Sequence, residues 1–180
     1  MLWCSEHLVV SETFLYFAYG SNMLTRRLQE RTPSARIVGR CFVAGYRLTF
    51  DKVSIDGSGK CTLTPTGRPE DRADGVLFRV DHVELPALDR AEGLGNGYRR
   101  EAIEVTTPGG NQMALTYIAT NTRAGLLPYD WYKEFVVRGA MEHGLPASYI
   151  DELQLTNSIP DPDINRRTEN FARLAASGVE

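Results

Sequence analysis

The first apolar stretch of the chain predicts a buried strand that runs directly into a short helix. Residues 14–19 are all apolar or aromatic, which is typical of a short strand buried on both faces. Gly20 breaks this run, and Asn22 belongs to the residue types that cap helix N-termini. We therefore expect a helix that begins after Asn22 and ends before Pro33. Its predicted core-facing residues are Met23, Leu24 and Leu28.

The middle of the chain is rich in strand patterns. Apolar and polar residues alternate over residues 46–50, and residues 75–80 form a second strand pattern. Two more strands are predicted at residues 98–106 and 112–119. The Pro-Gly-Gly-Asn run at residues 108–111 between them is a hairpin signal.

Helix patterns are fewer. Residues 84–92 form a short helix pattern with proline in its first turn and glycine after its end. Asp130 is placed to cap a longer helix that Gly144 stops, and Pro146 opens another short one. Residues 164–176 carry a weaker amphipathic pattern.

These elements predict an α+β fold, because the helices are too few and too irregularly spaced for repeated strand–helix–strand units. We expect a mixed, largely antiparallel sheet that forms a small barrel with helices outside. A length of 180 residues with 42% hydrophobic residues fits one domain. We expect a flexible leader at residues 1–13, the domain at 14–157 and a polar C-terminal tail at 158–180.

Composition removes several classes of function. The formal net charge of -3 gives no basic surface for nucleic acid. No apolar stretch is long enough to span a bilayer, and the N-terminus lacks the pattern of a secretory signal. Three widely spaced cysteines do not form a disulfide framework, which favours a reduced, cytoplasmic setting.

Two candidate sites of common kinds are disfavoured. The histidines, His7, His82 and His143, have no partners at metal-ligand spacing, so no metal site is predicted. His143 lies on an apolar helix face, which favours a structural role. The glycine-rich run at residues 93–97 goes from helix to strand, the reverse of phosphate-binding loops, so we interpret it as a loop.

The loop at residues 19–22 is the first candidate for chemistry. Gly20 lets a backbone approach a ligand closely, and amides at a helix start favour an anion such as a carboxylate. Ser21 adds a hydroxyl donor. The alternative is an ordinary turn followed by a helix cap at Asn22.

Glu92 is the second candidate. It shares one helix face with Leu85 and Leu88, at a spacing that turns the carboxylate toward the core. Burial and the helix C-terminus both oppose its negative charge, which suits a group that exchanges a proton. The alternative is a buried glutamate that is paired with an arginine, such as Arg99 or Arg100.

Three motifs, taken in order, resemble the γ-glutamylcyclotransferase (AIG2-like) family. They are F-L-Y-F-A-Y-G-S-N at residues 14–22, L-D-R-A-E-G at 88–93 and P-Y-D-W-Y-K at 128–133. The second is followed by Gly-Tyr at 97–98, and the resemblance extends over residues 14–153.

The resemblance implies a barrel-like fold and an enzyme of glutathione metabolism that converts a γ-glutamyl amino acid to 5-oxoproline and releases the free amino acid. It implies Glu92 as the catalytic acid–base. No cofactor is implied, because the substrate's own amine is the nucleophile. The implied partner is a small γ-glutamyl substrate, and the protein is a monomer or a homodimer. The implied substrate-binding residues are Tyr16, Phe17, Ala18, Tyr19, Gly20, Ser21 and Tyr132, with Tyr98 and Tyr117 lining the pocket.

Two departures from the family pattern put the leaving group in question. Gly59-Lys60-Cys61 stands where a Gly-x-Ala stretch is expected, and Asp74 replaces an aromatic residue. The substrate could therefore be a γ-glutamylamine or another γ-glutamyl conjugate. The chain could also be a non-catalytic module that binds γ-glutamyl ligands.

Overall fold

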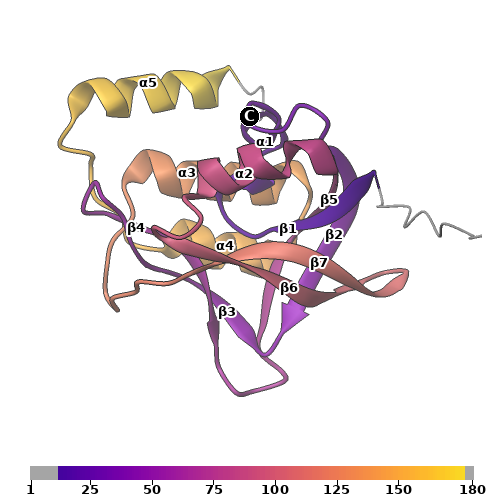
Figure 1. Ribbon diagram of the computed structural model, residues 1–180. Helices are drawn as coiled ribbons and strands as arrows, with labels where there is room; N and C mark the ends of the chain where they lie inside the picture. Colours follow the sequence, from indigo (N-terminus) through magenta and orange to yellow (C-terminus); the bar gives the residue numbers. More distant parts are fainter. Residues whose placement is uncertain (1–11, 177–180) are drawn as a thin grey trace, which may run out of the picture.

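A computed structural model describes residues 12–176 and shows a closed five-stranded barrel with helices around it (Figure 1). The strands are β1 Thr13–Ala18, β2 Arg36–Ala44, β3 Tyr46–Val53, β4 Gly59–Pro65, β5 Arg72–Asp81, β6 Tyr98–Thr107 and β7 Gly110–Ala119. The α-helices are α1 Thr25–Gln29, α2 Leu85–Glu92, α3 Asp130–Glu142, α4 Ala147–Leu155 and α5 Ile164–Ala175. Two 3₁₀ turns are η1 Ser21–Met23 and η2 His82–Glu84.

The barrel confirms the predicted fold class. Its strand order is β1-β5-β2-β6-β7, and every pairing is antiparallel except the parallel contact of β1 with β7 that closes it. Strands β3 and β4 form a separate hairpin. Figure 1 shows α2, α3 and α5 along one side of the barrel, above the strands in this view.

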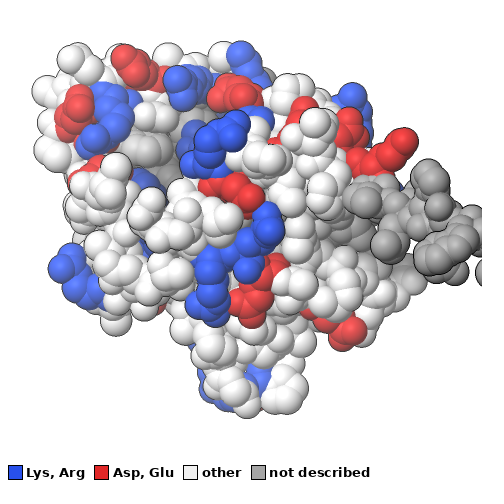
Figure 2. All heavy atoms as spheres, in the orientation of Figure 1, with Lys and Arg blue, Asp and Glu red and all other residues white. Residues whose placement is uncertain are grey.

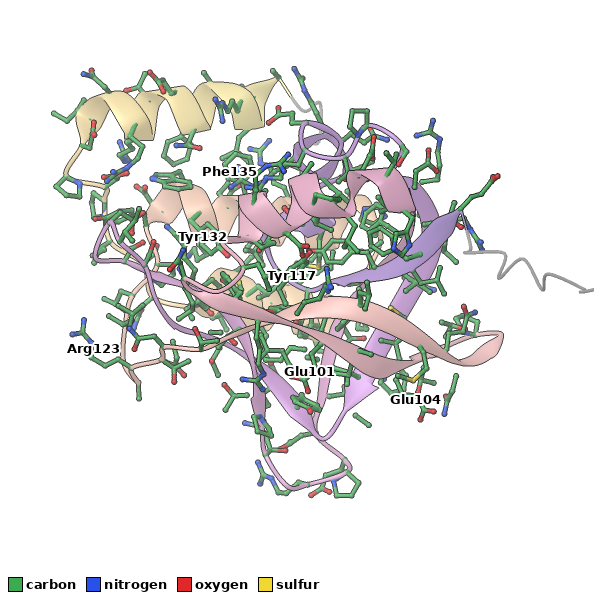
Figure 3. All side chains as sticks on the ribbon, viewed as in Figure 1. Glu101, Glu104, Tyr117, Arg123, Tyr132 and Phe135 are labelled. Carbon is green, nitrogen blue, oxygen red and sulfur yellow. The ribbon has the colours of Figure 1, made fainter. Side chains whose placement is uncertain are left out.

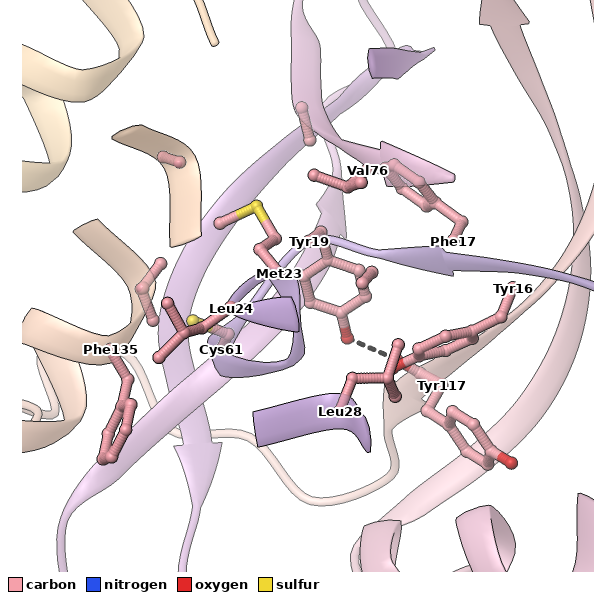
Figure 4. Packing of buried hydrophobic residues seen from close by; sticks show 14 of the residues in the cluster. Tyr16, Phe17, Tyr19, Met23, Leu24, Leu28, Cys61, Val76, Tyr117 and Phe135 are labelled. Carbon is pink, nitrogen blue, oxygen red and sulfur yellow. Dashed lines mark hydrogen bonds between the residues drawn. The ribbon is translucent and has the colours of Figure 1, made fainter. Parts of the chain in front are cut away.

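The core lies between the barrel and α3. Met23, Leu24 and Leu28 are at most 2% exposed, as their spacing predicts, and Figure 4 shows Leu24 on the side of Phe135 and Leu28 nearer to Tyr19. Gly139 of α3 packs directly against the segment that follows β1, because a Cβ atom on this glycine would lie 2.6 Å from the backbone nitrogen of Leu24. The packing of α3 therefore fixes the segment that follows β1.

Both predicted side-chain helix caps are wrong. Helix α1 begins only at Thr25, with Leu24 at the N-cap position, because the Asn22 side chain binds buried polar groups instead. Helix α3 has Tyr129 at its N-cap. Asp130 lies inside the first turn, where its carboxylate accepts a 2.7 Å hydrogen bond from Arg167.

The C-terminal segment packs on the domain through its own helix. Helix α5 covers nearly the predicted range and contacts α3. The buried carboxylate of Asp161, just before it, accepts hydrogen bonds from Trp131 Nε1 at 2.8 Å and from Arg166 at 2.6 Å. Most of the predicted leader lies outside the described residues, and Thr13 already belongs to β1.

His143 has the contacts of a structural histidine. Its side chain is 6% exposed, and Nε2 lies 2.9 Å from the carbonyl oxygen of Met23 and 3.2 Å from Thr25 Oγ1. Within residues 12–176, no group of three potential metal ligands comes together. None of the helices in that range has the length and apolar character that a membrane span requires.

Candidate active site

A pocket opens where the end of β1 meets the C-terminus of α2. It brings together Glu92 and the loop after β1, two features that lie 70 residues apart in the sequence. Tyrosines from β1, β6, β7 and α3 complete its wall. The lining residues are Tyr16, Tyr19, Gly20, Ser21, Asn22, Cys61, Glu92, Tyr98, Tyr117 and Tyr132.

Two of the candidate substrate-binding residues do not line this pocket. Side chains alternate along β1, so Tyr16 faces the pocket and Phe17 faces the opposite side, fully buried. A Cβ atom on Gly75 would lie only 2.5 Å from the Phe17 ring, which shows how tightly the ring is packed. A substrate contact by Phe17 or Ala18 stays a prediction.

Glu92 is held by two polar side chains. Its Oε1 accepts hydrogen bonds from Asn22 Nδ2 at 2.7 Å and from Arg31 Nη1 at 3.1 Å. Arg31 also donates to Asn22 Oδ1 at 2.7 Å, so the three side chains form a closed Glu92–Asn22–Arg31 cluster. Among the described residues, Oε2 of Glu92 has no recorded partner, which leaves this oxygen for a substrate.

Glu92 does pair with an arginine, as the alternative interpretation expected, but the partner is Arg31 and not Arg99 or Arg100. Arg99 pairs with Glu101, and Arg100 pairs with Asp89. Arg31 was missed because it follows a short helix 61 residues away, and no local spacing signals that contact. The role of Asn22 was missed because its residue type fits a helix cap equally well.

The tyrosines are hydrogen-bonded and neutral. Burial raises the pKa of Tyr16, Tyr19, Tyr98 and Tyr132 well above the usual range, so these hydroxyls keep their protons. Tyr16 accepts a 3.0 Å hydrogen bond from Asn22, which ties it to the Glu92–Asn22–Arg31 cluster. The pocket therefore presents hydroxyl groups beside a single carboxylate.

Two tyrosines fix the strand that lies opposite the loop. The Cys61 amide donates to the Tyr132 hydroxyl at 3.1 Å, and the Tyr98 hydroxyl donates to the Cys61 carbonyl at 2.8 Å. A Cβ atom on Gly20 would lie 3.0 Å from Cys61 Cβ, so glycine permits this close approach. Figure 4 shows the loop anchored from the other side, where the Tyr19 hydroxyl donates to the Tyr117 carbonyl.

Two backbone donors lie in the loop that lines the pocket. Within the described chain, the amides of Gly20 and Ser21 have no recorded hydrogen-bond acceptor. Ser21 is buried, and its Oγ accepts a 3.1 Å hydrogen bond from Arg27 Nε. Unpaired amides next to a guanidinium group suit an anion or a carbonyl oxygen that gains negative charge.

The pocket cysteine is not set up as a nucleophile. Burial raises the pKa of both the Cys61 and the Cys41 thiol to about 12, and a thiol reacts as its thiolate. We expect iodoacetamide at pH 8 to leave both cysteines unmodified in the folded protein and to alkylate both in urea. Peptide mapping by mass spectrometry measures this. Rapid alkylation of Cys61 in the folded protein, with loss of turnover, would contradict it.

Comparisons with known proteins agree with the geometry. Residues 73–153 match the model of the AIG2-like family. Gamma-glutamylcyclotransferase from Homo sapiens is 34% identical over 152 residues, which cover 79% of this chain and 78% of the human protein. The Mus musculus protein of the same name is 36% identical over 150 residues, with the same coverage.

A solved structure titled gamma-glutamyl cyclotransferase has the same fold. It is 30% identical and superposes with a TM-score of 0.81, over 93% of this chain and 100% of that chain. The similarity therefore extends over nearly the whole chain. On these grounds, the chain belongs to the γ-glutamylcyclotransferase family.

Proposed function

We propose that this protein is a γ-glutamylcyclotransferase that converts a γ-glutamyl amino acid to 5-oxoproline and releases the free amino acid. The observation that carries the proposal is Glu92, which Asn22 and Arg31 hold through Oε1 at a pocket that the loop after β1 also lines. The family relatives carry the same activity in their names. We place the reaction in the cytoplasm, as part of glutathione metabolism.

The reaction is an intramolecular acyl transfer. The α-amine of the γ-glutamyl group attacks the γ-carbonyl carbon, which forms the ring C–N bond, and the C–N bond to the leaving amine then breaks. Because nucleophile and electrophile belong to one molecule, a pocket that holds the substrate folded supplies much of the rate. No electrons are transferred, so the chemistry requires no redox cofactor.

Glu92 moves the proton. The attacking amine must lose a proton to become a nucleophile, and the leaving amine must gain one. Oε2 of Glu92 takes the first proton and returns it to the leaving nitrogen. Arg31 and Asn22 keep Oε1 fixed, so the carboxylate stays oriented through both steps.

The loop amides bind the negatively charged part of the substrate. The N–H groups of Gly20 and Ser21 hold either the α-carboxylate or the oxyanion that forms at the γ-carbonyl. Both assignments place the γ-glutamyl group between this loop and Glu92. A non-catalytic binding module is disfavoured, because a pocket used only for binding gains nothing from a carboxylate oriented by two side chains.

Turnover is the direct test of this proposal. The protein is incubated with a panel of γ-glutamyl amino acids and γ-glutamylamines, and 5-oxoproline is detected by mass spectrometry. Formation of 5-oxoproline from at least one compound supports the proposal. Ligand-induced stabilisation of the folded protein without any 5-oxoproline would instead identify a binding module.

Replacing Asn22 tests whether Glu92 must be oriented. We expect Asn22→Ala to lower kcat by about ten- to hundred-fold, because the carboxylate loses its 2.7 Å hydrogen bond and can rotate. The control is Asn111→Ala, which removes an exposed asparagine that donates to Glu104 on the β6–β7 hairpin. If Asn22→Ala keeps the kcat of the Asn111→Ala variant, the orienting role of Asn22 is wrong.

A further inference from the structure

The pocket continues into a wider groove whose walls carry five Lys and Arg side chains. The groove holds about 350 Å³ and shares Ser21, Glu92, Tyr98 and Tyr132 with the pocket. On the face seen in Figure 2, Lys and Arg side chains gather near α2, with acidic side chains between them. The cationic residues that line the groove are Arg27, Arg31, Lys52, Lys60 and Arg90.

Acidic partners balance only part of this charge. Arg31 pairs with Glu92, and Lys60 pairs with Asp56 at 3.0 Å. The other three, Arg27, Lys52 and Arg90, have no carboxylate within 4.0 Å among the described residues. The groove is therefore a positive region of a chain whose formal net charge is -3.

Three of these positive charges, on Arg27, Lys52 and Lys60, are held at a cost. Burial lowers the pKa of Arg27 to about 10, with Arg31 as the next cause. Burial also lowers the pKa of Lys52 and of Lys60, and each of Arg27 and Lys52 lowers that of Lys60 further. A bound anion would relieve this repulsion, so the groove suits a negatively charged ligand.

Lys52 is the cation best placed to meet that ligand. Its Nζ lies 5.1 Å from the centre of the Tyr98 ring. A Cβ atom on Gly97 would lie 3.1 Å from Cε and from Nζ, so the lysine packs directly on the glycine loop after Glu92. The backbone of β3 is anchored beside it, because the amide of Val53 donates to Asn121 O at 3.0 Å.

Lys60 has a different role. Its Nζ donates to Asp56 and to Ser58 at 2.8–3.0 Å and lies 4.7 Å above Trp131 and 4.6 Å above Tyr132. These contacts use its donors within the protein. Lys60 adds positive potential to the groove, while Lys52 keeps its donors for a ligand.

We propose that this groove binds the leaving group and selects γ-glutamyl compounds whose leaving amine carries a second negative charge, such as an acidic amino acid. Lys52 is the residue that recognises that charge. The inference rests on the proposed function, since the γ-glutamyl group must occupy the pocket for the leaving group to reach the groove. Leaving groups from ordinary amino acids carry one carboxylate, which leaves part of the positive charge uncompensated.

Two substrates of equal shape test the proposal. γ-Glutamyl-aspartate and γ-glutamyl-asparagine differ in one charge, so the ratio of their kcat/KM values measures recognition of that charge. We expect the wild type to favour the aspartate compound by about ten-fold at low salt. Raising the ionic strength from about 0.05 M to about 0.5 M should reduce this ratio, because salt screens the interaction.

Variants at Lys52 test whether this lysine causes the preference for the aspartate compound. We expect Lys52→Met to bring the ratio to about one, mainly through loss of activity on the aspartate compound, and Lys52→Arg to retain a preference. The control Arg123→Met removes an exposed charge that points away from the body of the molecule in Figure 3, and it should leave the ratio unchanged. Thermal unfolding verifies that each variant is folded.

The outcomes separate this inference from the proposed function. If no compound yields 5-oxoproline, the proposed function fails and the inference with it. If both compounds are converted at equal rates, or if Lys52→Met keeps the wild-type ratio, the inference alone is overturned. If Lys52→Met does not fold, the wild-type ratio at low and high salt and the ratio of the Lys52→Arg variant decide. A ratio of about one in both proteins overturns the inference.

Discussion

Glu92→Gln is expected to lower kcat for 5-oxoproline formation by a factor on the order of one hundred or more. Glutamine has nearly the shape of glutamate, and its carbonyl oxygen can still accept from Asn22 and Arg31. The variant therefore keeps the geometry of the pocket. It cannot accept the proton of the attacking amine, so the loss falls on kcat, and KM should change little.

The matched control is Glu101→Gln. Glu101 lies on β6 and pairs with Arg99. Figure 3 shows it well below Tyr132 in this view. This variant should retain wild-type turnover. If Glu92→Gln is folded and keeps kcat within about three-fold of the control, Glu92 only positions the substrate, and another group must carry the proton.

The elements of the fold follow from local patterns. Alternation and turn residues predicted the β6–β7 hairpin within two residues, and the glycine after α2 takes the left-handed conformation with φ 68. The closure of the barrel by β1 and β7 is a contact across about 100 residues. No local pattern encodes that contact, so the sequence predicted a small barrel but not the order of its strands.

The site was predictable where one helix face carried the signal. The leucines at residues 85 and 88 placed Glu92 on an inward face, and the structure puts it at the pocket. Arg31 could not be predicted, because it lies 61 residues before Glu92 and only the tertiary structure brings the two side chains together. The cap assigned to Asn22 failed for a related reason: its amide has two uses, and only the tertiary structure decides between them.

Gly139→Ala is expected to destabilise the protein by about 1–2 kcal/mol and to lower turnover as well. The added Cβ would lie 2.6 Å from Leu24 N and 2.7 Å from Met23 Cβ, so backbone must move. Overpacking of this kind costs ~1–3 kcal/mol, and the better helix propensity of alanine offsets up to ~1 kcal/mol. Urea denaturation measures the change in the free energy of unfolding.

The control for this change is Gly109→Ala. A Cβ there meets only Thr107 Oγ1 at 3.7 Å, an ordinary contact, so stability should change by less than about 0.5 kcal/mol. The loss of turnover in Gly139→Ala has a separate cause. Met23 and Leu24 directly follow Ser21 and Asn22, so a displaced segment shifts the loop amides and the side chain that orients Glu92.

Stability and activity should therefore fall together at Gly139, although this glycine is not one of the residues that line the pocket. A variant that loses stability but keeps wild-type kcat under conditions where it is fully folded would show that the loop adjusts independently of α3. In that case the geometry of Glu92 depends on its bonds to Asn22 and Arg31 alone. The expected result would instead mean that the contact between α3 and η1 helps to position the site.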